Sequence, residues 1–167
     1  MTRTYVIAHY NEELAPLTHV SPRDIIHKGL DIPNLGRESS SWLLWILNHY
    51  ENLPDFITFL QGNPFDHTSL EDITADPESP YQRHGLLLTC DLNGNPHHGT
   101  LNLRNALTIM GVTHPGVVPF CMGAQFTVAK EQILKYPYYR YAQLFAYSVS
   151  NENAPWELER LWETFFA

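Results

Sequence analysis

Residues 55–67 read DFITFLQGNPFDH, and the interpretation of the whole chain starts from this stretch. The apolar run FITFL has the length and the aromatic and β-branched content of a buried strand, and it stops at Gly62. Asn63-Pro64 then turns the chain and leads to Asp66 and His67. A carboxylate beside an imidazole at a strand end can hold a divalent cation or act as general acid and base. In an ordinary loop, Asp66 would cap the turn and His67 would be exposed.

Two more strand-length segments and a helix precede this stretch. Residues 4–10 (TYVIAHY) and 24–28 (DIIHK) predict strands, and residues 37–50 (RESSSWLLWILNHY) predict a helix with a broad apolar face. This order favours a parallel β-α-β arrangement with right-handed crossovers. We therefore expect an α/β fold in three layers with a mostly parallel central sheet, formed by residues 1–167 as a single domain.

The expected sheet brings polar residues together along one edge. In parallel sheets the carboxyl ends of the strands share an edge, and ligands bind there. Asn11 and Glu12 follow the first strand, Lys28 ends the second and Gln61 ends the third. Lys28 and Arg37 are the cations nearest this edge, and they could grip a diphosphate or serve as solvated surface charges.

The second half of the chain has a less regular pattern. Residues 68–84 are acidic and contain prolines, which predicts a solvated excursion that could act as a lid over the edge described above. The other expected elements are a strand at 85–90, a helix at 101–110, extended chain with a bend at 117–128, a short helix at 129–135, an aromatic run at 136–141 and a last helix from Pro155.

Composition and motif content argue against several function classes. Eighteen acidic and ten basic residues give a net charge of −8, which argues against non-specific binding of nucleic acid. The chain has no long apolar run typical of a signal peptide or a membrane span, so we expect a cytoplasmic protein without a transmembrane segment. GxSxG, P-loop and GxGxxG motifs are absent, which argues against the usual serine-hydrolase, NTPase and dinucleotide-binding sites.

Cysteine and histidine patterns give only weak signals. The two cysteines, Cys90 and Cys121, lack CxxC spacing, which predicts two partly buried free thiols. None of the nine histidines forms an HExxH motif; adjacent His97 and His98 are weak zinc candidates. Most of the others, His114 among them, are explained as buried, hydrogen-bonded imidazoles.

Six short motifs occur in an informative order. They are YNE at 10–12, NLGRE at 34–38, NHYENLPD at 48–55, FLQGNPFDH at 59–67, GAQFTV at 123–128 and ERLW at 159–162. From about residue 5 to residue 166 this order resembles an uncharacterised, glycosyltransferase-like family of domains of unknown function. The layout is also similar to that of nucleotide-sugar transferases of the GT-A fold.

The resemblance implies transfer of a sugar from a nucleoside-diphosphate donor to a glycan or other hydroxyl acceptor. In GT-A enzymes a strand ends in FLDxD, whose carboxylates hold Mg²⁺ or Mn²⁺ against the donor diphosphate. Here Gln61-Gly62-Asn63 replaces the acidic triplet. Asp66, with His67 or Gln61, would have to provide the metal ligands instead.

The same resemblance assigns roles to the other site residues. Asn11 and Glu12 would contact the nucleotide, and Lys28 and Arg37 the diphosphate or a wall of the site. Gln125 matches the segment that lines the acceptor pocket. Glu159 takes the place of the carboxylate that deprotonates the acceptor hydroxyl, with Glu157 and Glu152 as weaker candidates.

Two other function classes are open at this point. The missing acidic triplet favours a non-catalytic carbohydrate- or partner-binding domain on the same fold. Asp66 and His67, joined by other histidines, would instead suit a metal-dependent hydrolase that holds zinc or iron.

Overall fold

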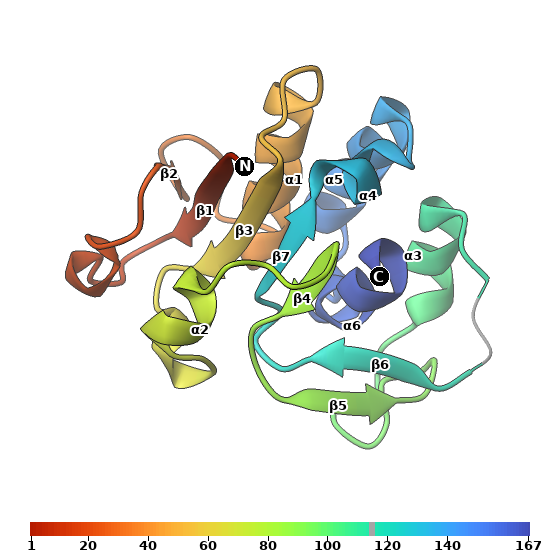
Figure 1. Cartoon of the computed structure of the whole chain (residues 1–167). Helices are drawn as coiled ribbons and strands as arrows, with labels where there is room; N and C mark the ends of the chain where they lie inside the picture. Colours follow the sequence, from red (N-terminus) through yellow and green to blue (C-terminus); the bar gives the residue numbers. More distant parts are fainter. Residues whose placement is uncertain (114–115) are drawn as a thin grey trace.

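A five-stranded sheet in the order β2-β1-β3-β7-β4 lies at the centre of the structure, a computed structural model that describes residues 1–113 and 116–167 (Figure 1). His114 is therefore outside the described residues. The strands are β1 Arg3–His9, β2 Arg23–His27, β3 Phe56–Gln61, β4 Tyr81–Arg83 and β7 Phe126–Ala129. β1 is parallel to β2 and β3, whereas β7 is antiparallel to both β3 and β4. β4 therefore points the same way as β3, and the predicted α/β class with a mostly parallel sheet is confirmed.

Helices and a small second sheet surround this central sheet. The helices are η1 Ala15–Leu17, α1 Arg37–His49, η2 Pro64–Asp66, α2 Leu70–Thr74, α3 Leu103–Met110, α4 Lys130–Leu134, α5 Tyr138–Ser150 and α6 Ala154–Phe166. β5 (Leu87–Cys90) and β6 (Val118–Cys121) form an antiparallel ribbon beside α6 (Figure 1). Cys90 and Cys121 in this ribbon are free, as predicted, and both are more deeply buried than expected. None of the helices in the described ranges has the length and apolar character needed to cross a membrane.

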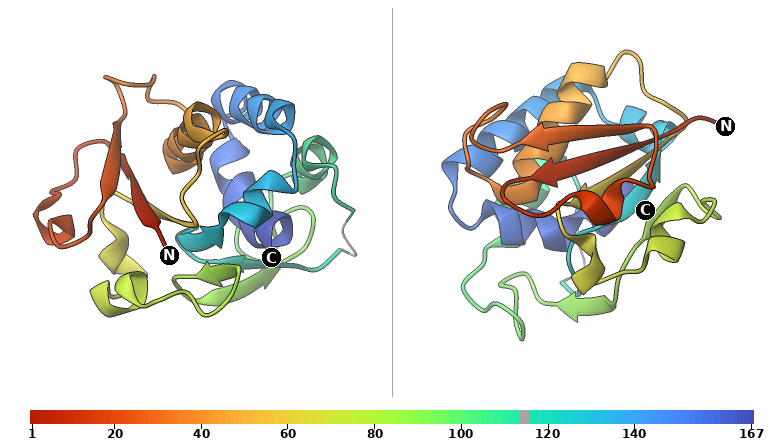
Figure 2. Two further views of the ribbon diagram at one scale, coloured as in Figure 1. Left: turned by 45° about the horizontal axis from the view of Figure 1, so that its top comes forward. Right: turned by 90° about the vertical axis from the view of Figure 1, so that its left-hand side faces the viewer.

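Alternating side chains along β1 define the two faces of the sheet. Val6 and Ala8 belong to the main core, whereas Tyr5 and Ile7 belong to a smaller core on the opposite face. α1 and α6 cover the main face, α5 packs on α1, and the short η1 and α2 cover the other face (Figure 2). The sheet therefore lies between a thick and a thin helical layer.

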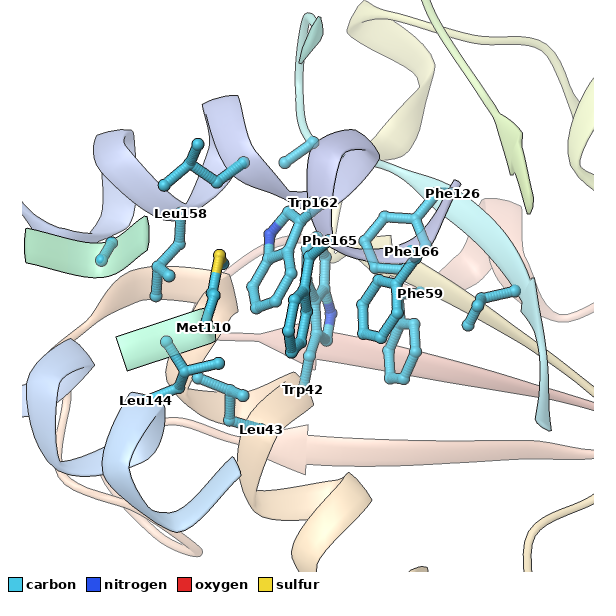
Figure 3. Packing of buried hydrophobic residues seen from close by; sticks show 14 of the residues in the cluster. Trp42, Leu43, Phe59, Met110, Phe126, Leu144, Leu158, Trp162, Phe165 and Phe166 are labelled. Atoms are coloured by element: carbon cyan, nitrogen blue, oxygen red, sulfur yellow. The ribbon is translucent and has the colours of Figure 1, made fainter. Parts of the chain in front are cut away.

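An aromatic cluster fixes α1 and α6 against the sheet (Figure 3). The ring of Trp42 in α1 lies 5.7 Å from that of Phe59 and 5.8 Å from that of Phe126. Trp42 also donates its indole N–H to the carbonyl oxygen of Leu60 at 3.2 Å. Trp162 of α6 lies 5.9 Å from Phe126 and 6.4 Å from Trp42, so the three rings contact one another. Because α1 runs back across β3 after β2, its first turn lies at the carboxyl edge of the parallel strands.

Residues 68–84 are mostly exposed, as predicted, but they do not form the lid that was considered, because none of them lines the cleft at the carboxyl edge of the sheet. Ile73 of α2 is completely buried in the smaller core, and β4 joins the central sheet by pairing with β7. Arg3 on β1 donates to the carbonyl oxygens of Ile73 and Ala75, which holds the end of α2 at the amino end of β1. The segment therefore packs on the sheet and does not cover its carboxyl edge.

α5 also differs from the sequence prediction, because the residues of its first turn were interpreted only as an aromatic run and not as the start of a helix. Tyr141 is buried, and Tyr136, just before the helix, stacks on Phe165 with ring centroids 4.0 Å apart. Tyr138 and Tyr139 are exposed. Tyrosine and serine have modest helix propensity, so burial against α1 and α6 stabilises a helix that local sequence barely indicates.

Candidate functional site

A cleft of about 600 Å³ lies at the carboxyl ends of β1, β2 and β3, the edge at which parallel sheets bind ligands. Its walls come from the three strand ends, the start of α1 and η2. The lining residues are Ala8, His9, Tyr10, Glu12, Lys28, Asn34, Arg37, Glu38, Gln61, Gly62, Asn63 and Asp66. Five predicted site residues meet in this cleft: Glu12, Lys28, Arg37, Gln61 and Asp66. Asn11 is exposed next to Glu12 but is not part of the lining.

The start of α1 has an unusual backbone. Gly36 has a φ of +70°, and a Cβ atom there would lie 2.6 Å from the carbonyl oxygen of Ser148 in α5. Glycine therefore lets α1 begin in close contact with α5. Arg37 has a φ of +46°, which residues with a side chain rarely adopt and which is concentrated at functional sites. Its guanidinium lies over the ring of Trp156, 5.4 Å from the centroid.

Lys28 is a buried cation in the cleft. Its ammonium donates to the carbonyl oxygen of Leu35 at 3.0 Å and to Oγ of Ser40 at 2.8 Å. Burial lowers its pKa to about 8, an effect that Arg37 increases and Glu38 opposes. These two bonds use two of the three ammonium hydrogens and hold the loop before α1 in place.

Glu38 is a functional candidate that the sequence analysis did not select. It is half-buried in the first turn of α1 and lines the cleft. Burial raises the pKa of its carboxyl to about 7; its own backbone N–H, Arg37 and Lys28 oppose this effect, and Glu159 adds to it. The carboxyl can therefore take up or release a proton near neutral pH. Its place in the NLGRE motif was the available sequence signal.

Glu12 and Gln61 are held in fixed positions at the ends of β1 and β3. Glu12 Oε2 accepts the backbone N–H of Tyr10 at 2.7 Å. A Cβ atom at Gly62 would lie 2.4 Å from the same oxygen, so glycine makes room for this carboxylate. Gln61 donates its side-chain amide to the carbonyl oxygen of Gly123 at 2.9 Å. The walls of the cleft are thus set by hydrogen bonds as well as by packing.

His9 and His27 form a second feature that the sequence analysis missed. They are register partners in the parallel strands β1 and β2, and their Nδ1 atoms lie 2.8 Å apart. Nε2 of His9 lies 3.0 Å from the carbonyl oxygen of Glu12, which can only accept. Nε2 of His9 therefore carries the hydrogen. In the neutral pair, His27 then donates from Nδ1 to Nδ1 of His9, which ties β2 to the loop after β1.

His67 and Gln125 do not lie where the sequence analysis placed them. The ring of His67 lies against Gly123, where a Cβ atom would be 2.4 Å from Cδ2 of the imidazole, and it does not line the cleft. Gln125 is completely buried and donates its amide to the carbonyl oxygen of Pro64 at 3.1 Å. Gln125 therefore supports the turn after β3 from inside, which corrects its assignment to an acceptor pocket.

Glu159 also lies outside the cleft lining. Its carboxylate accepts the backbone N–H of Gly123 at 3.1 Å and pairs with Arg160 at 3.3 Å. Glu157 is buried and accepts from the backbone N–H of Asn102 and from a tyrosine hydroxyl, and Glu152 is exposed. None of the three predicted candidates for the catalytic base therefore lines the cleft. The charge of Glu159 nevertheless acts on the carboxyl of Glu38, which does line it.

The predicted metal pair is not assembled. Asp66 is exposed at the cleft, whereas His67 points to Gly123. Across the described ranges, no three His, Cys, Asp or Glu side chains converge in a way that could hold a metal ion. His97 and His98 contact different aromatic rings and do not form a site together. Mg²⁺ in proteins often takes only one or two carboxylates together with substrate phosphates, and Asp66 and Glu12 fit that limited role.

The cleft therefore combines cations with carboxylates of different burial. Lys28 and Arg37 can bind an anion, and Glu38 can exchange a proton near neutral pH. No family model, no curated protein and no solved structure matches this chain. Its functional interpretation depends on the geometry of the cleft.

Proposed function

We propose that the protein is a GT-A-like glycosyltransferase that moves a sugar from a nucleoside-diphosphate donor to a hydroxyl acceptor in this cleft. The observation that carries the proposal is the meeting of Lys28, Arg37 and the start of α1 at the carboxyl edge of the sheet. These groups supply the positive charge that a diphosphate requires. The volume of about 600 Å³ is in the range of small-ligand sites.

Lys28 and Arg37 would bind the diphosphate together with the first backbone N–H groups of α1. Lys28 is fixed by Leu35 and Ser40, so its charge is in place before the donor arrives. When the bond between sugar and phosphate breaks, negative charge grows on the leaving diphosphate. Cations already held in position stabilise that charge without reorganisation.

Glu12 and Tyr10 would contact the nucleoside. The carboxylate of Glu12 is held by a backbone N–H and can accept hydroxyl hydrogens of a ribose or sugar. The ring of Tyr10 is 48% exposed at the cleft, which makes it available for stacking on a base. Asn11 is close enough in sequence to join this contact, although it does not line the cleft.

A bound Mn²⁺ or Mg²⁺ would neutralise charge on the diphosphate, and Asp66 and Glu12 are the carboxylates that would hold it. His67 is excluded from that role by its position against Gly123. The hydrolase alternative depended on Asp66 and His67 acting together, so it loses its central pair.

Isothermal titration calorimetry with a panel of nucleotide sugars and free nucleoside diphosphates, with and without Mn²⁺, tests the proposal. We expect wild type to bind one of them and Arg37→Gln to bind it about 10- to 100-fold more weakly, as for loss of a charged hydrogen bond. Asp66→Asn should remove only the Mn²⁺-dependent part of the affinity. Lys135→Met, an exposed cation outside the cleft, is the control. Failure of every donor to bind wild type would refute the proposal.

A non-catalytic carbohydrate-binding domain is the second candidate. It is favoured by the end of β3, where Gln61 lies in place of an acid and uses its amide on Gly123. Glycan-array binding without turnover of any donor would support this candidate. Transfer or hydrolysis of a donor that depends on the cleft residues would exclude it.

A further inference from the structure

Glu38 is surrounded by charged groups from three elements. Lys28 comes from the end of β2, Arg37 precedes Glu38 in α1, and Glu159 lies on α6. The carboxyl is half-buried, yet it lines the same cleft as the two cations. It can therefore meet a bound ligand while it is largely shielded from bulk water.

We propose that Glu38 is the catalytic base of the sugar transfer and that Glu159 is a positioning residue that tunes it from outside the cleft. This inference rests on the proposed function. The Glu38 carboxylate takes the proton of the acceptor hydroxyl while the acceptor oxygen forms a bond to the anomeric carbon. The bond from that carbon to the phosphate oxygen breaks, and its electron pair leaves with the nucleoside diphosphate. Glu38 then releases its proton to water.

The other carboxylates at the cleft are less suited to this step. Glu12 is held by the backbone N–H of Tyr10 and lies against Gly62, so its position is fixed at the wall. Asp66 is exposed, as an ordinary surface carboxylate would be. Glu38 lies partly shielded in the first turn of α1, in the same cleft wall as Lys28 and Arg37. Burial raises its pKa to about 7, and a base whose pKa lies near the working pH transfers protons most effectively.

Glu159 affects Glu38 through its charge. Its carboxylate is bound to the N–H of Gly123 and to Arg160, and its negative charge raises the pKa of Glu38. Glutamine at position 159 would keep the acceptor for Gly123 but remove the charge. Glu159→Gln should therefore lower the pKa of Glu38 with little change in the cleft walls.

The first measurement needs no substrate. Titration of ¹³C-labelled glutamate side chains followed by NMR should show an inflection near pH 7 that is absent in Glu38→Gln. Glu159→Gln should move this inflection to lower pH. Glu152→Gln, which removes an exposed acid just before α6, should leave it in place. An inflection for Glu38 near pH 4.5, or one that Glu159→Gln leaves in place, would overturn the inference that Glu159 raises the pKa of Glu38.

The second measurement is turnover of the donor identified by calorimetry. We expect Glu38→Gln to lower kcat by at least about 100-fold, the usual contribution of general base catalysis, with nucleoside-diphosphate affinity within about threefold of wild type. The unchanged affinity would show that the variant is folded. The acidic limb of the kcat profile should have its inflection near pH 7 and move with Glu159→Gln.

The outcomes separate the two proposals. Transfer that survives Glu38→Gln at more than a third of the wild-type kcat overturns the role of Glu38 and leaves the transferase proposal standing. An acidic limb of the kcat profile that stays in place when Glu159→Gln moves the NMR inflection would also overturn the role of Glu38 and leave the transferase proposal standing. Absence of transfer from every donor by wild type overturns the transferase proposal and the base together.

Discussion

Replacing His84 by glutamine is expected to change how the stability of the protein depends on pH. His84 is 2% exposed, and its Nε2 lies 2.7 Å from Oγ1 of Thr127. Burial, reinforced by the charge of Arg3, lowers its pKa to about 4 from the ordinary 6.5. The folded protein therefore keeps a neutral imidazole at pH values where the unfolded chain binds a proton.

The size of the effect follows from the two pKa values. Stability contributed by neutral His84 is fully present above pH 6.5 and is lost as pH falls toward 4, by about 2.5 kcal/mol between pH 7 and pH 4.5. Glu38 acts in the opposite sense, because its pKa is raised from 4.5 to about 7. Its contribution is present below pH 4.5 and is lost as pH rises toward 7, again by about 2.5 kcal/mol. The two effects nearly cancel in wild type.

Urea unfolding followed by tryptophan fluorescence at several pH values from 7 to 4.5 measures this balance. Wild type should change by less than about 1 kcal/mol over this range, His84→Gln should gain about 2.5 kcal/mol as the pH falls, and Glu38→Gln should lose a similar amount. Glutamine can keep a hydrogen bond to Thr127, so the variant should fold. Asp55, whose pKa is lowered to about 2, titrates below this window. A His84→Gln curve parallel to that of wild type would refute the reasoning.

Two further predictions concern the start of α1 and Lys28. Gly36→Ala should destabilise the protein by more than the roughly 1–2 kcal/mol that a left-handed backbone costs a residue with a side chain, because its Cβ would also meet the Ser148 carbonyl. Gly29→Ala, with a φ of +88° but open space around it, is the matched control in thermal unfolding and should show only the backbone cost. Acylation rates measured by peptide mass spectrometry should have a midpoint near pH 8 for Lys28 and a higher one for Lys130, whose pKa is raised by its hydrogen bond to an aspartate. Equal midpoints would contradict the burial of the Lys28 amine.

Local patterns predicted the parallel part of the fold well. The strand at 56–61 and the helix beginning at residue 37 have the expected bounds, because continuous apolar runs and helical periodicity report burial directly. β4 was missed because a strand of three residues directly after a proline carries little local signal. Its pairing with β7 depends on a partner far along the chain, which no local window contains.

The candidate site was predicted at the level of the strand ends but not in its side-chain directions. The rule that parallel strands share a carboxyl edge brought Lys28 and Gln61 to the cleft. It could not show that His67 turns to Gly123 or that His9 meets His27, because those contacts depend on register and rotamer. Glu38 was missed because its altered pKa depends on burial, which a sequence does not state.

The placement of β7 has a consequence for the synthesis of the protein. β3 pairs with β1 on one side, and its other backbone edge pairs with residues 126–129, about seventy residues later in the chain. A growing chain on the ribosome that has formed β1, β2 and β3 would therefore expose the apolar edge FITFL until much later residues emerge. Open edges of this kind pair with other chains and aggregate. Chaperone protection during translation should consequently matter most in the interval between the appearance of β3 and that of β7.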